Sequence, residues 1–252
     1  MTPQSISIYR KKLRRAYCNI LGHRNYKKFA VLGHSRTGSN YLFMGLNSSS
    51  CVKMFHEVFA ERHRALAGKD FDQIFPMVFQ KESRNIKAVG FKLFYEHLTR
   101  DEWEKFLSHK YLRVIHLTRE NRLRTIVSLD IAFKTDQWGV SANDKNKELV
   151  EKRIILDTST LFDRLDKIHD CEKFTRDLFK DNNILEVVYE KLTTKPGETF
   201  QDIGEYLGVD DIDISKITLT KQNPENLEQL IENYDEVYGL LKNTKYAPHL
   251  NC

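Results

Sequence analysis

The chain has 252 residues, of which 40% are hydrophobic, so it is long enough to bury one sizeable core. No apolar run approaches the roughly 20 residues of a membrane-spanning helix, and no apolar stretch follows the N-terminal charges as it does in a secretory signal. The net charge of +5 suits a protein that binds small anions, and it is also compatible with weak, salt-sensitive binding of nucleic acid.

The N-terminus contains the densest basic run of the chain, YRKKLRRAY from Tyr9 to Tyr17. We interpret this run as a solvated helix face, and the alternative is a peripheral contact with a membrane or a partner. We predict a basic extension over residues 1–27 and one domain over residues 28–252, because no repeat, low-complexity segment or Pro/Gly/Ser-rich linker divides the chain.

Short apolar runs alternate with helical patterns along this domain. Each run is rich in β-branched or aromatic residues, and the runs predict buried strands over residues 28–33, 87–94, 111–118 and 183–190. Helices are predicted over residues 101–110 and 196–208, the second opened by Pro196 and closed by Gly208. The alternation predicts an α/β fold with a mainly parallel sheet flanked by helices, and ligands at the carboxyl ends of the strands.

The segment from Asp144 to Asp181 contains neither glycine nor proline. Its apolar residues recur at three-to-four-residue and seven-residue intervals: Ile154, Leu161, Leu165 and Ile168. This spacing predicts one or two amphipathic helices whose apolar stripe belongs to the core.

A near-match to a phosphate-binding loop follows the first predicted strand, in AVLGHSRTGSNYLFMGL from Ala30 to Leu46. Gly33 and Gly38 have the G-x-x-x-x-G spacing, but Ser39 and Asn40 replace the lysine and the Mg²⁺-binding hydroxyl of that motif. A strand, a turn and a helix still aim backbone N–H groups and a helix dipole at one point. The loop therefore predicts a site for an anion whose transfer needs no metal, and it argues against hydrolysis of ATP or GTP.

Side chains within the loop can also bind an anion. Arg36 can direct its planar guanidinium at phosphate-type oxygens, and Thr37 and Ser39 add hydroxyl donors. The alternative is a plain strand-to-helix turn with Ser39 as the helix cap.

A second basic cluster lies in HLTRENRLRTIVSLDIA, where Arg119 follows the third predicted strand. Arg122, Arg124 and Ser128 belong to the helix expected there, and the last two are four residues apart and share a face. Two anion sites at strand ends of one sheet predict a ligand with two separated phosphate-type groups. The alternative is a solvated, arginine-rich helix.

These two motifs, FAVLGHSRTGSNYL and LTRENRLRTIVSLDIA, resemble those of the bacterial carbohydrate sulfotransferases that act on trehalose, lipopolysaccharide and nodulation factors. The resemblance continues through GFKLFYEHL, VVYEKL, IGEYLGV and KQNPENLEQLIENYDEV, and so covers most of the chain after Lys28. It implies an α/β fold related to P-loop kinases. It also implies that the donor is 3′-phosphoadenosine 5′-phosphosulfate (PAPS), which leaves as adenosine 3′,5′-bisphosphate (PAP), and that no metal takes part.

The resemblance also implies roles for individual residues. Arg119 and Ser128 would hold the 3′-phosphate, and Lys221 with Gln222 would belong to a late loop that closes over the nucleotide. The 5′-phosphosulfate would be wrapped by the loop residues Arg36, Thr37, Gly38, Ser39 and Asn40, with Arg36 as the cation.

Two departures from the family pattern stand out. His34 and Ser35 replace the more usual residues between the first glycine and Arg36. His97 stands where many relatives carry glutamine, which points to a different acceptor pocket.

The segment MFHEVF supplies the candidate base. Glu57 matches the acidic position of the family, and it could accept the proton of an acceptor hydroxyl if burial raises its pKa toward neutrality. His56 is the rival base, because adjacent side chains of an extended segment point to opposite faces and only one can face the acceptor. Lys92, at a strand end, is a candidate further cation. The alternative without a catalytic role is that Glu57 is an acidic residue in the first turn of a helix and that Lys92 is a solvated lysine.

The resemblance predicts a hydroxyl-bearing small molecule or glycan as acceptor, and no nucleic-acid partner. A P-loop kinase or NTPase is the first alternative, and it lacks support because no lysine follows Gly38 and no Walker-B aspartate is found. A non-catalytic RNA-binding protein is the second, but no aromatic single-strand-binding motif is present. The cysteines have no paired spacing and are interpreted as reduced thiols of a cytoplasmic protein: Cys18, Cys51, Cys171 and Cys252.

Overall fold

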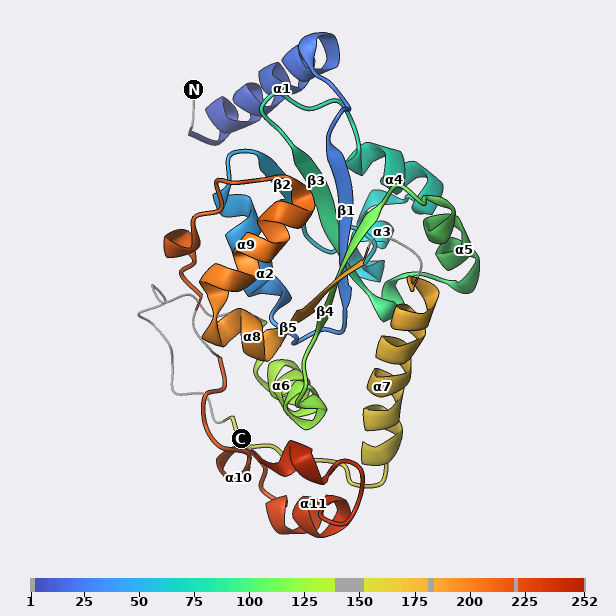
Figure 1. The fold of residues 1–252 in the computed structure, drawn as a ribbon, viewed down its shortest axis with the longest axis vertical. Helices are drawn as coiled ribbons and strands as arrows, with labels where there is room; N and C mark the ends of the chain where they lie inside the picture. Colours follow the sequence, from blue (N-terminus) through green and yellow to red (C-terminus); the bar gives the residue numbers. More distant parts are fainter. Residues whose placement is uncertain (1–2, 139–151, 181–183, 220–221, 252) are drawn as a thin grey trace.

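The computed structural model describes residues 3–138, 152–180, 184–219 and 222–251. Its centre is a single parallel sheet of five strands in the order β2-β3-β1-β4-β5, with β1 in the middle (Figure 1). The strands are β1 (Lys27–Gly33), β2 (Val52–Phe55), β3 (Ala88–Phe94), β4 (Arg113–Thr118) and β5 (Ile184–Val188). Their parallel pairing brings all carboxyl ends to one edge, and Gly33 lies beside Phe94 of β3 and Leu117 of β4.

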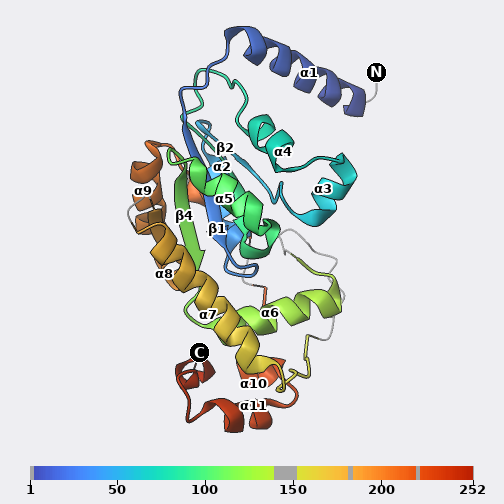
Figure 2. The same cartoon turned by 90° about the vertical axis from the view of Figure 1, so that its right-hand side faces the viewer.

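Helices cover both faces of the sheet, as Figures 1 and 2 show. One face packs against α4 and α5 through a phenylalanine-rich core, with α3 on the same side of the sheet (Figure 2), and the other packs against α2, α8 and α9. A third apolar cluster joins α6, α7, α10 and α11 beyond the carboxyl edge of the sheet. The helices on the two faces are α2 (Ser39–Ser48), α3 (Glu61–Ala67), α4 (Phe71–Val78), α5 (Arg100–Ser108), α8 (Tyr189–Thr194) and α9 (Pro196–Leu207).

The remaining helices lie at the two ends of the molecule. The helix α1 (Pro3–Leu21) lies beyond the amino ends of the strands, and the third cluster is formed by α6 (Arg122–Thr135), α7 (Leu161–Leu178), α10 (Leu227–Leu230) and α11 (Tyr234–Leu241) (Figure 2). None of the helices in the described part of the chain combines the length and the apolar character needed to span a bilayer.

The fold confirms the predicted α/β class and the four predicted strands, whose ends shift by a few residues. The predicted helices over residues 101–110 and 196–208 are α5 and α9, and Gly208 ends α9 in a left-handed conformation with φ 67°. The strand β2 was not predicted, because it is only four residues long and carries a lysine.

The prediction for residues 144–181 needs correction. Leu161, Leu165 and Ile168 lie on α7 as expected, and residues 144–151 lie outside the described residues. Ile154 is not helical: it forms an isolated β-bridge with Ile231, with hydrogen bonds that join its backbone N–H to Leu230 and its carbonyl to Glu232. Ile154 is nevertheless buried in the third apolar cluster, together with residues of α7. Its apolar character therefore correctly predicted a core position, although it did not predict the local structure.

Candidate active site

The loop between β1 and α2 is held in a tight, specific shape. Arg36 and Gly38 both have positive φ, 67° and 90°, which is costly for arginine and ordinary for glycine. A Cβ atom on Gly38 would lie 2.6 Å from the ring of Tyr189, and one on Gly33 would lie 2.3 Å from the carbonyl oxygen of Leu117. Both glycines are therefore required for the close approach of neighbouring elements, which explains their spacing independently of any ligand. The helix α2 begins at Ser39, and its cap residue is Gly38 with no side-chain hydrogen bond, so Ser39 is not the helix cap.

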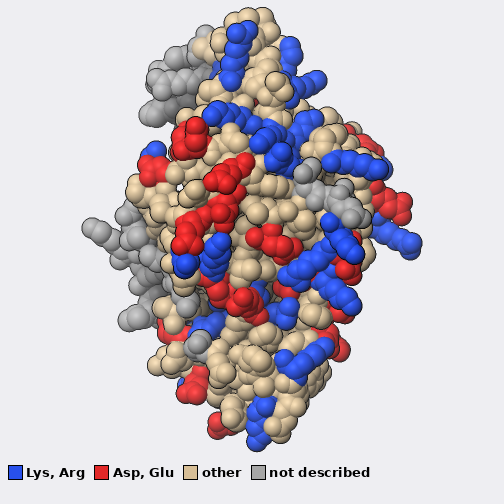
Figure 3. Space-filling model, in the orientation of Figure 1, with Lys and Arg blue, Asp and Glu red and all other residues tan. Residues whose placement is uncertain are grey.

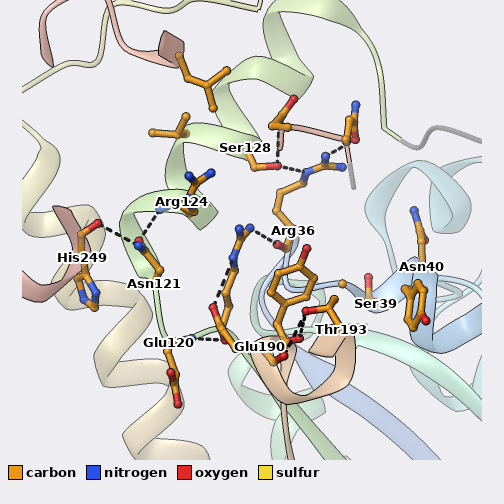
Figure 4. A pocket seen from close by; sticks show the side chains of 18 of the residues that line it. Arg36, Ser39, Asn40, Glu120, Asn121, Arg124, Ser128, Glu190, Thr193 and His249 are labelled. Atoms are coloured by element: carbon orange, nitrogen blue, oxygen red, sulfur yellow. Dashed lines mark hydrogen bonds and ion pairs between the residues drawn. The ribbon is translucent and has the colours of Figure 1, made fainter. Parts of the chain in front are cut away.

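Arg36 extends from this loop to two distant parts of the chain. Its Nε donates to the Ser128 hydroxyl at 3.0 Å, and a second nitrogen donates to the carbonyl oxygen of Trp138 at 2.9 Å. Its remaining nitrogen donates to the side-chain oxygen of Gln222. Three segments that are far apart in the sequence thus meet at one guanidinium, which Figure 4 shows beside Ser128.

Arg119 lies directly behind the loop. One of its terminal nitrogens donates to the carbonyl oxygen of Arg36 at 3.3 Å, and its guanidinium lies over the Tyr189 ring at 4.5 Å. The residue is only 7% exposed, and its Nε has no hydrogen-bond acceptor among the described residues, with the Glu190 carboxylate 3.9 Å away. Burial is the largest cause of the lowered pKa of both Arg36 and Arg119. The charge of Arg119 lowers the pKa of Arg36 further, whereas Tyr189 and Glu190 oppose the shift in the pKa of Arg119. A buried and a half-buried guanidinium close together form a strong site for an anion.

A cavity of about 900 Å³ opens beside these arginines (Figure 4). It is bounded by the loop, the start of α6, the helix α8 and the C-terminal segment, and Arg36, Arg119, Ser128 and Tyr189 all line it. Asn121 fixes the C-terminal wall, because its side-chain amide donates to the carbonyl oxygens of His249 and Asn251 at 2.9 and 3.1 Å. The cavity is large enough for a nucleotide-sized ligand.

His249 contributes an uncharged ring to that wall. Burial, with a smaller contribution from Arg122, lowers the pKa of His249 to about 4, so the imidazole is neutral at physiological pH. The imidazole of His249 therefore adds no charge to a cavity that is otherwise lined by both cations and the carboxylates of Glu120 and Glu190.

A second cavity of about 910 Å³ lies on the other side of the loop. It is lined by His56, Glu57, Lys92 and His97, together with residues of α6 and α7. Both cavities share the lining residues Arg36, Ser39, Asn40 and Trp138. The loop therefore forms a boundary at which ligands in the two cavities can meet.

Lys92 joins the loop to Glu57. It is only 1% exposed, and its Nζ donates to the Asn40 side-chain oxygen at 2.7 Å and forms an ion pair with the Glu57 carboxylate at 2.9 Å. Arg62 approaches the other carboxylate oxygen of Glu57 at 3.2 Å. The solvated-lysine interpretation is therefore wrong, because this cation is buried between the loop and a carboxylate.

The ion pair decides the protonation state of Glu57. Burial is the largest single effect and would raise the pKa of Glu57, but the charges of Lys92 and Arg62 together outweigh it and lower the pKa. The expectation that burial raises this pKa toward neutrality is therefore wrong. Glu57 is ionised at neutral pH, as a proton acceptor must be. The pKa of Lys92 is itself lowered, mainly by burial and against the opposing effect of Glu57.

His56 and His97 lie near this pair in different settings. The ring of His56 stacks on Phe43 at 3.7 Å, and burial followed by the charge of Lys92 lowers the pKa of His56. His97 accepts a hydrogen bond from the backbone N–H of Phe94 at 3.2 Å, and burial is the main cause of its lowered pKa. Both imidazoles line the second cavity and are neutral at neutral pH.

Most of the predicted site residues meet at this boundary, and Lys221 lies outside the described residues. Its neighbour Gln222 contacts Arg36. Sequence reasoning missed Tyr189 and Trp138, which shape the loop and line the cavities. The tyrosine of VVYE, which follows the last valine of a predicted strand, was a usable signal for Tyr189, whereas no local pattern indicated Trp138. No group of three or more histidine, cysteine or carboxylate side chains suited to a metal occurs among the residues that the structure describes.

Comparisons with known proteins agree with this architecture. The family model described as Stf0 sulphotransferase matches residues 46–236. A sulfotransferase from Alicyclobacillus acidocaldarius superposes with a TM-score of 0.53 at 14% identity, over 88% of this chain and 91% of that one. A mouse sulfotransferase, SULT7A1, solved in complex with PAP, gives a TM-score of 0.45 at 15% identity over 81% of this chain and 67% of its own.

No curated protein sequence matches the chain at a significant level. The Alicyclobacillus structure supports the fold alone, since its identity is low. The family model is the more specific finding, because it spans well over half of the chain, from within α2 to within α11. On this match and the parallel five-stranded sheet, the chain belongs to the Stf0 sulfotransferase family.

Proposed function

We propose that this protein transfers a sulfuryl group from PAPS to a hydroxyl group of a carbohydrate or glycolipid. The observation that carries the proposal is the juxtaposition of Arg36 and Arg119 at the loop, with a guanidinium nitrogen of Arg119 bonded to the backbone oxygen of Arg36 at 3.3 Å. Membership of a sulfotransferase family supports sulfuryl transfer. Two cations that line one cavity, the buried Arg119 and the half-buried Arg36, support a donor with two anionic groups.

We assign the 3′-phosphate to Arg119 and Ser128. Arg119 is buried and has an N–H group without an acceptor among the described residues, so an anionic oxygen there would supply one. The 5′-phosphosulfate is assigned to Arg36 and to the backbone N–H groups from Thr37 to Asn40. The guanidinium of Arg36 contacts Ser128 and is therefore within reach of both anions, and we assign it to the phosphosulfate because it belongs to the loop.

The reaction is a displacement at sulfur. The acceptor oxygen forms a new S–O bond while the bond from sulfur to the 5′-phosphate oxygen breaks, and its electron pair leaves with that oxygen on PAP. Arg36 and the loop amides can stabilise the charge that grows on the departing oxygen, as preorganised donors do. These donors take the part that Mg²⁺ and the P-loop lysine play in nucleotide hydrolysis, so the proposed scheme needs no metal.

Glu57 accepts the proton of the acceptor hydroxyl in this scheme. It lines the second cavity, which shares Arg36, Ser39 and Asn40 with the first. The Nζ of Lys92 lies 2.9 Å from the Glu57 carboxylate and keeps that group ionised. The same Nζ donates to the Asn40 side-chain oxygen at 2.7 Å and so links Glu57 to the loop. We infer that the first cavity takes the donor, that the second takes the acceptor, and that Lys92 adds positive charge where the two meet.

The proposed location is the cytoplasm. The cysteines within the described residues are free thiols, as expected in a reducing compartment: Cys18, Cys51 and Cys171. The acceptor is proposed to be a hydroxyl-bearing glycan or small molecule, without a nucleic-acid partner.

The experiment that tests this proposal is transfer of labelled sulfate from PAPS to a panel of sugars and glycolipids in the presence of EDTA. We expect label in a carbohydrate product and stoichiometric release of PAP. Hydrolysis of ATP that requires Mg²⁺, with no sulfated product from any acceptor in the panel, would refute the proposal.

A further inference from the structure

The N-terminal helix α1 packs on the molecule by its polar side. Cys18 is 1% exposed, and Arg15 donates to the carbonyl oxygen of Lys81 at 3.2 Å and lies 3.6 Å from the Glu82 carboxylate. Figures 1 and 2 show α1 at one end of the molecule, beyond the amino ends of the strands. Among the described side chains of α1, a cation and one small side chain therefore contact the body, and the backbone oxygen of Asn19 accepts a hydrogen bond from Lys81 at 3.1 Å.

The apolar side of α1 faces away from the body. Leu13, Tyr17 and Ile20 are 53%, 53% and 77% exposed. Their spacing of four and three residues puts them on one stripe of the helix, roughly opposite Cys18. A surface helix normally turns such a stripe toward the core, so the outward orientation of this one indicates that another surface covers it.

Charge on the helix indicates which surface that is. The sequence from Pro3 to Leu21 contains no aspartate or glutamate, and its basic residues are Arg10, Lys11, Lys12, Arg14 and Arg15. The exposed Lys12 and Arg14 flank the apolar stripe on its two sides. Lys and Arg side chains also gather on the surface at this end of the molecule (Figure 3).

We propose that α1 is an interfacial helix that binds a bilayer containing anionic lipids. The apolar stripe enters the boundary between headgroups and acyl chains, and the flanking cations contact the lipid phosphates and carboxylates. A second copy of the chain is the poorer occupant, because two such helices would bring like charges together with no acid on either to offset them. This proposal does not depend on the enzymatic activity.

The test is flotation of the full-length protein with phosphatidylcholine vesicles, with and without phosphatidylserine. We expect binding to the anionic vesicles only, and weaker binding at high salt. The triple variant Leu13→Ser/Tyr17→Ser/Ile20→Ser should bind at least about tenfold more weakly. Its folding should be unchanged, because all three side chains are exposed.

The matched control is Phe174→Ser/Tyr238→Ser, which removes apolar side chains that are 60% and 46% exposed on α7 and α11. It should bind vesicles as the wild type does. Equal binding by the triple variant and the wild type, or no binding by the wild type, would overturn the proposal. So would a dimer in sedimentation that the triple variant abolishes, since a second copy would then cover the stripe.

Discussion

Replacing Glu57 with glutamine is expected to lower the turnover of sulfuryl transfer by roughly two orders of magnitude or more. The substitution keeps the shape of the side chain and removes the group that accepts the hydroxyl proton. Binding of PAP should stay nearly unchanged, because the first cavity is lined by Arg36 and Arg119 and not by Glu57. Transfer rates together with PAP affinity measured by calorimetry check this result.

His56→Asn is the matched control, since His56 neighbours Glu57 and lines the same cavity. Its loss should cost much less activity, because its ring stacks on Phe43 and, within the described part of the chain, no ion pair ties it to the loop. If the glutamine variant stays active and the asparagine variant does not, the base is His56.

The same assignment fixes the direction of the pH dependence. Glu57 acts as a base only when ionised, and its pKa is lowered from 4.5 because Lys92 and Arg62 outweigh the effect of burial. The rate should therefore hold from neutral pH down to below 4.5 and fall only as the pH drops through the lowered pKa. A rate that is already lost well above pH 4.5, as the pH falls below 6.5, would instead indicate a histidine, since burial and Lys92 lower the pKa of His56 from 6.5.

Arg36→Ala should lower turnover by about 10²- to 10³-fold, the loss typical of removing one donor to a developing charge, with a smaller effect on PAP affinity. Arg119→Ala should do the opposite. It should weaken PAP binding about tenfold to a hundredfold, as expected for lost hydrogen bonds to a charged group, and leave turnover at saturating donor nearly intact. The reason is that the 3′-phosphate does not react.

Measured turnover and PAP affinity for the two variants separate these effects. Losses of the same kind in both would contradict the assignment. In particular, a large loss of PAP affinity in Arg36→Ala would mean that Arg36 binds the 3′-phosphate with Ser128, to which it donates at 3.0 Å.

The fold could be predicted where burial of an element produces an apolar pattern in its own sequence. The strands β1, β3 and β4 are covered on both faces and therefore appear as continuous apolar runs. The short edge strand β2 has a weaker apolar pattern, because Lys53 interrupts it. In the fold this lysine pairs with Glu82, which is far away in the sequence but only 2.5 Å away in space. That compensation depends on the tertiary fold and cannot be seen in four residues.

Some residues of the candidate site could likewise be predicted from the local sequence, and others depend on the tertiary fold. The loop around Arg36 could be found from its glycine spacing, and Arg119 from its position after a buried strand. The contact from Arg36 to Ser128 spans 92 residues, and the pair of Lys92 and Glu57 exists only because β2 lies beside β3. The wrong direction for the pKa of Glu57 follows from this, since local sequence does not reveal which cation stands next to a carboxylate.

The central claim, a metal-free site for a nucleotide with two phosphate groups, is tested most directly by calorimetric titration of the wild-type protein with PAP in EDTA. Arg36 and Arg119 both line the first cavity, and the loop lacks the lysine and hydroxyl that hold a Mg²⁺-nucleotide. The account predicts tight binding of PAP that is unchanged when Mg²⁺ replaces EDTA, and poor binding of ATP under both conditions. Binding of ATP that strictly requires Mg²⁺, with weak binding of PAP, would contradict it.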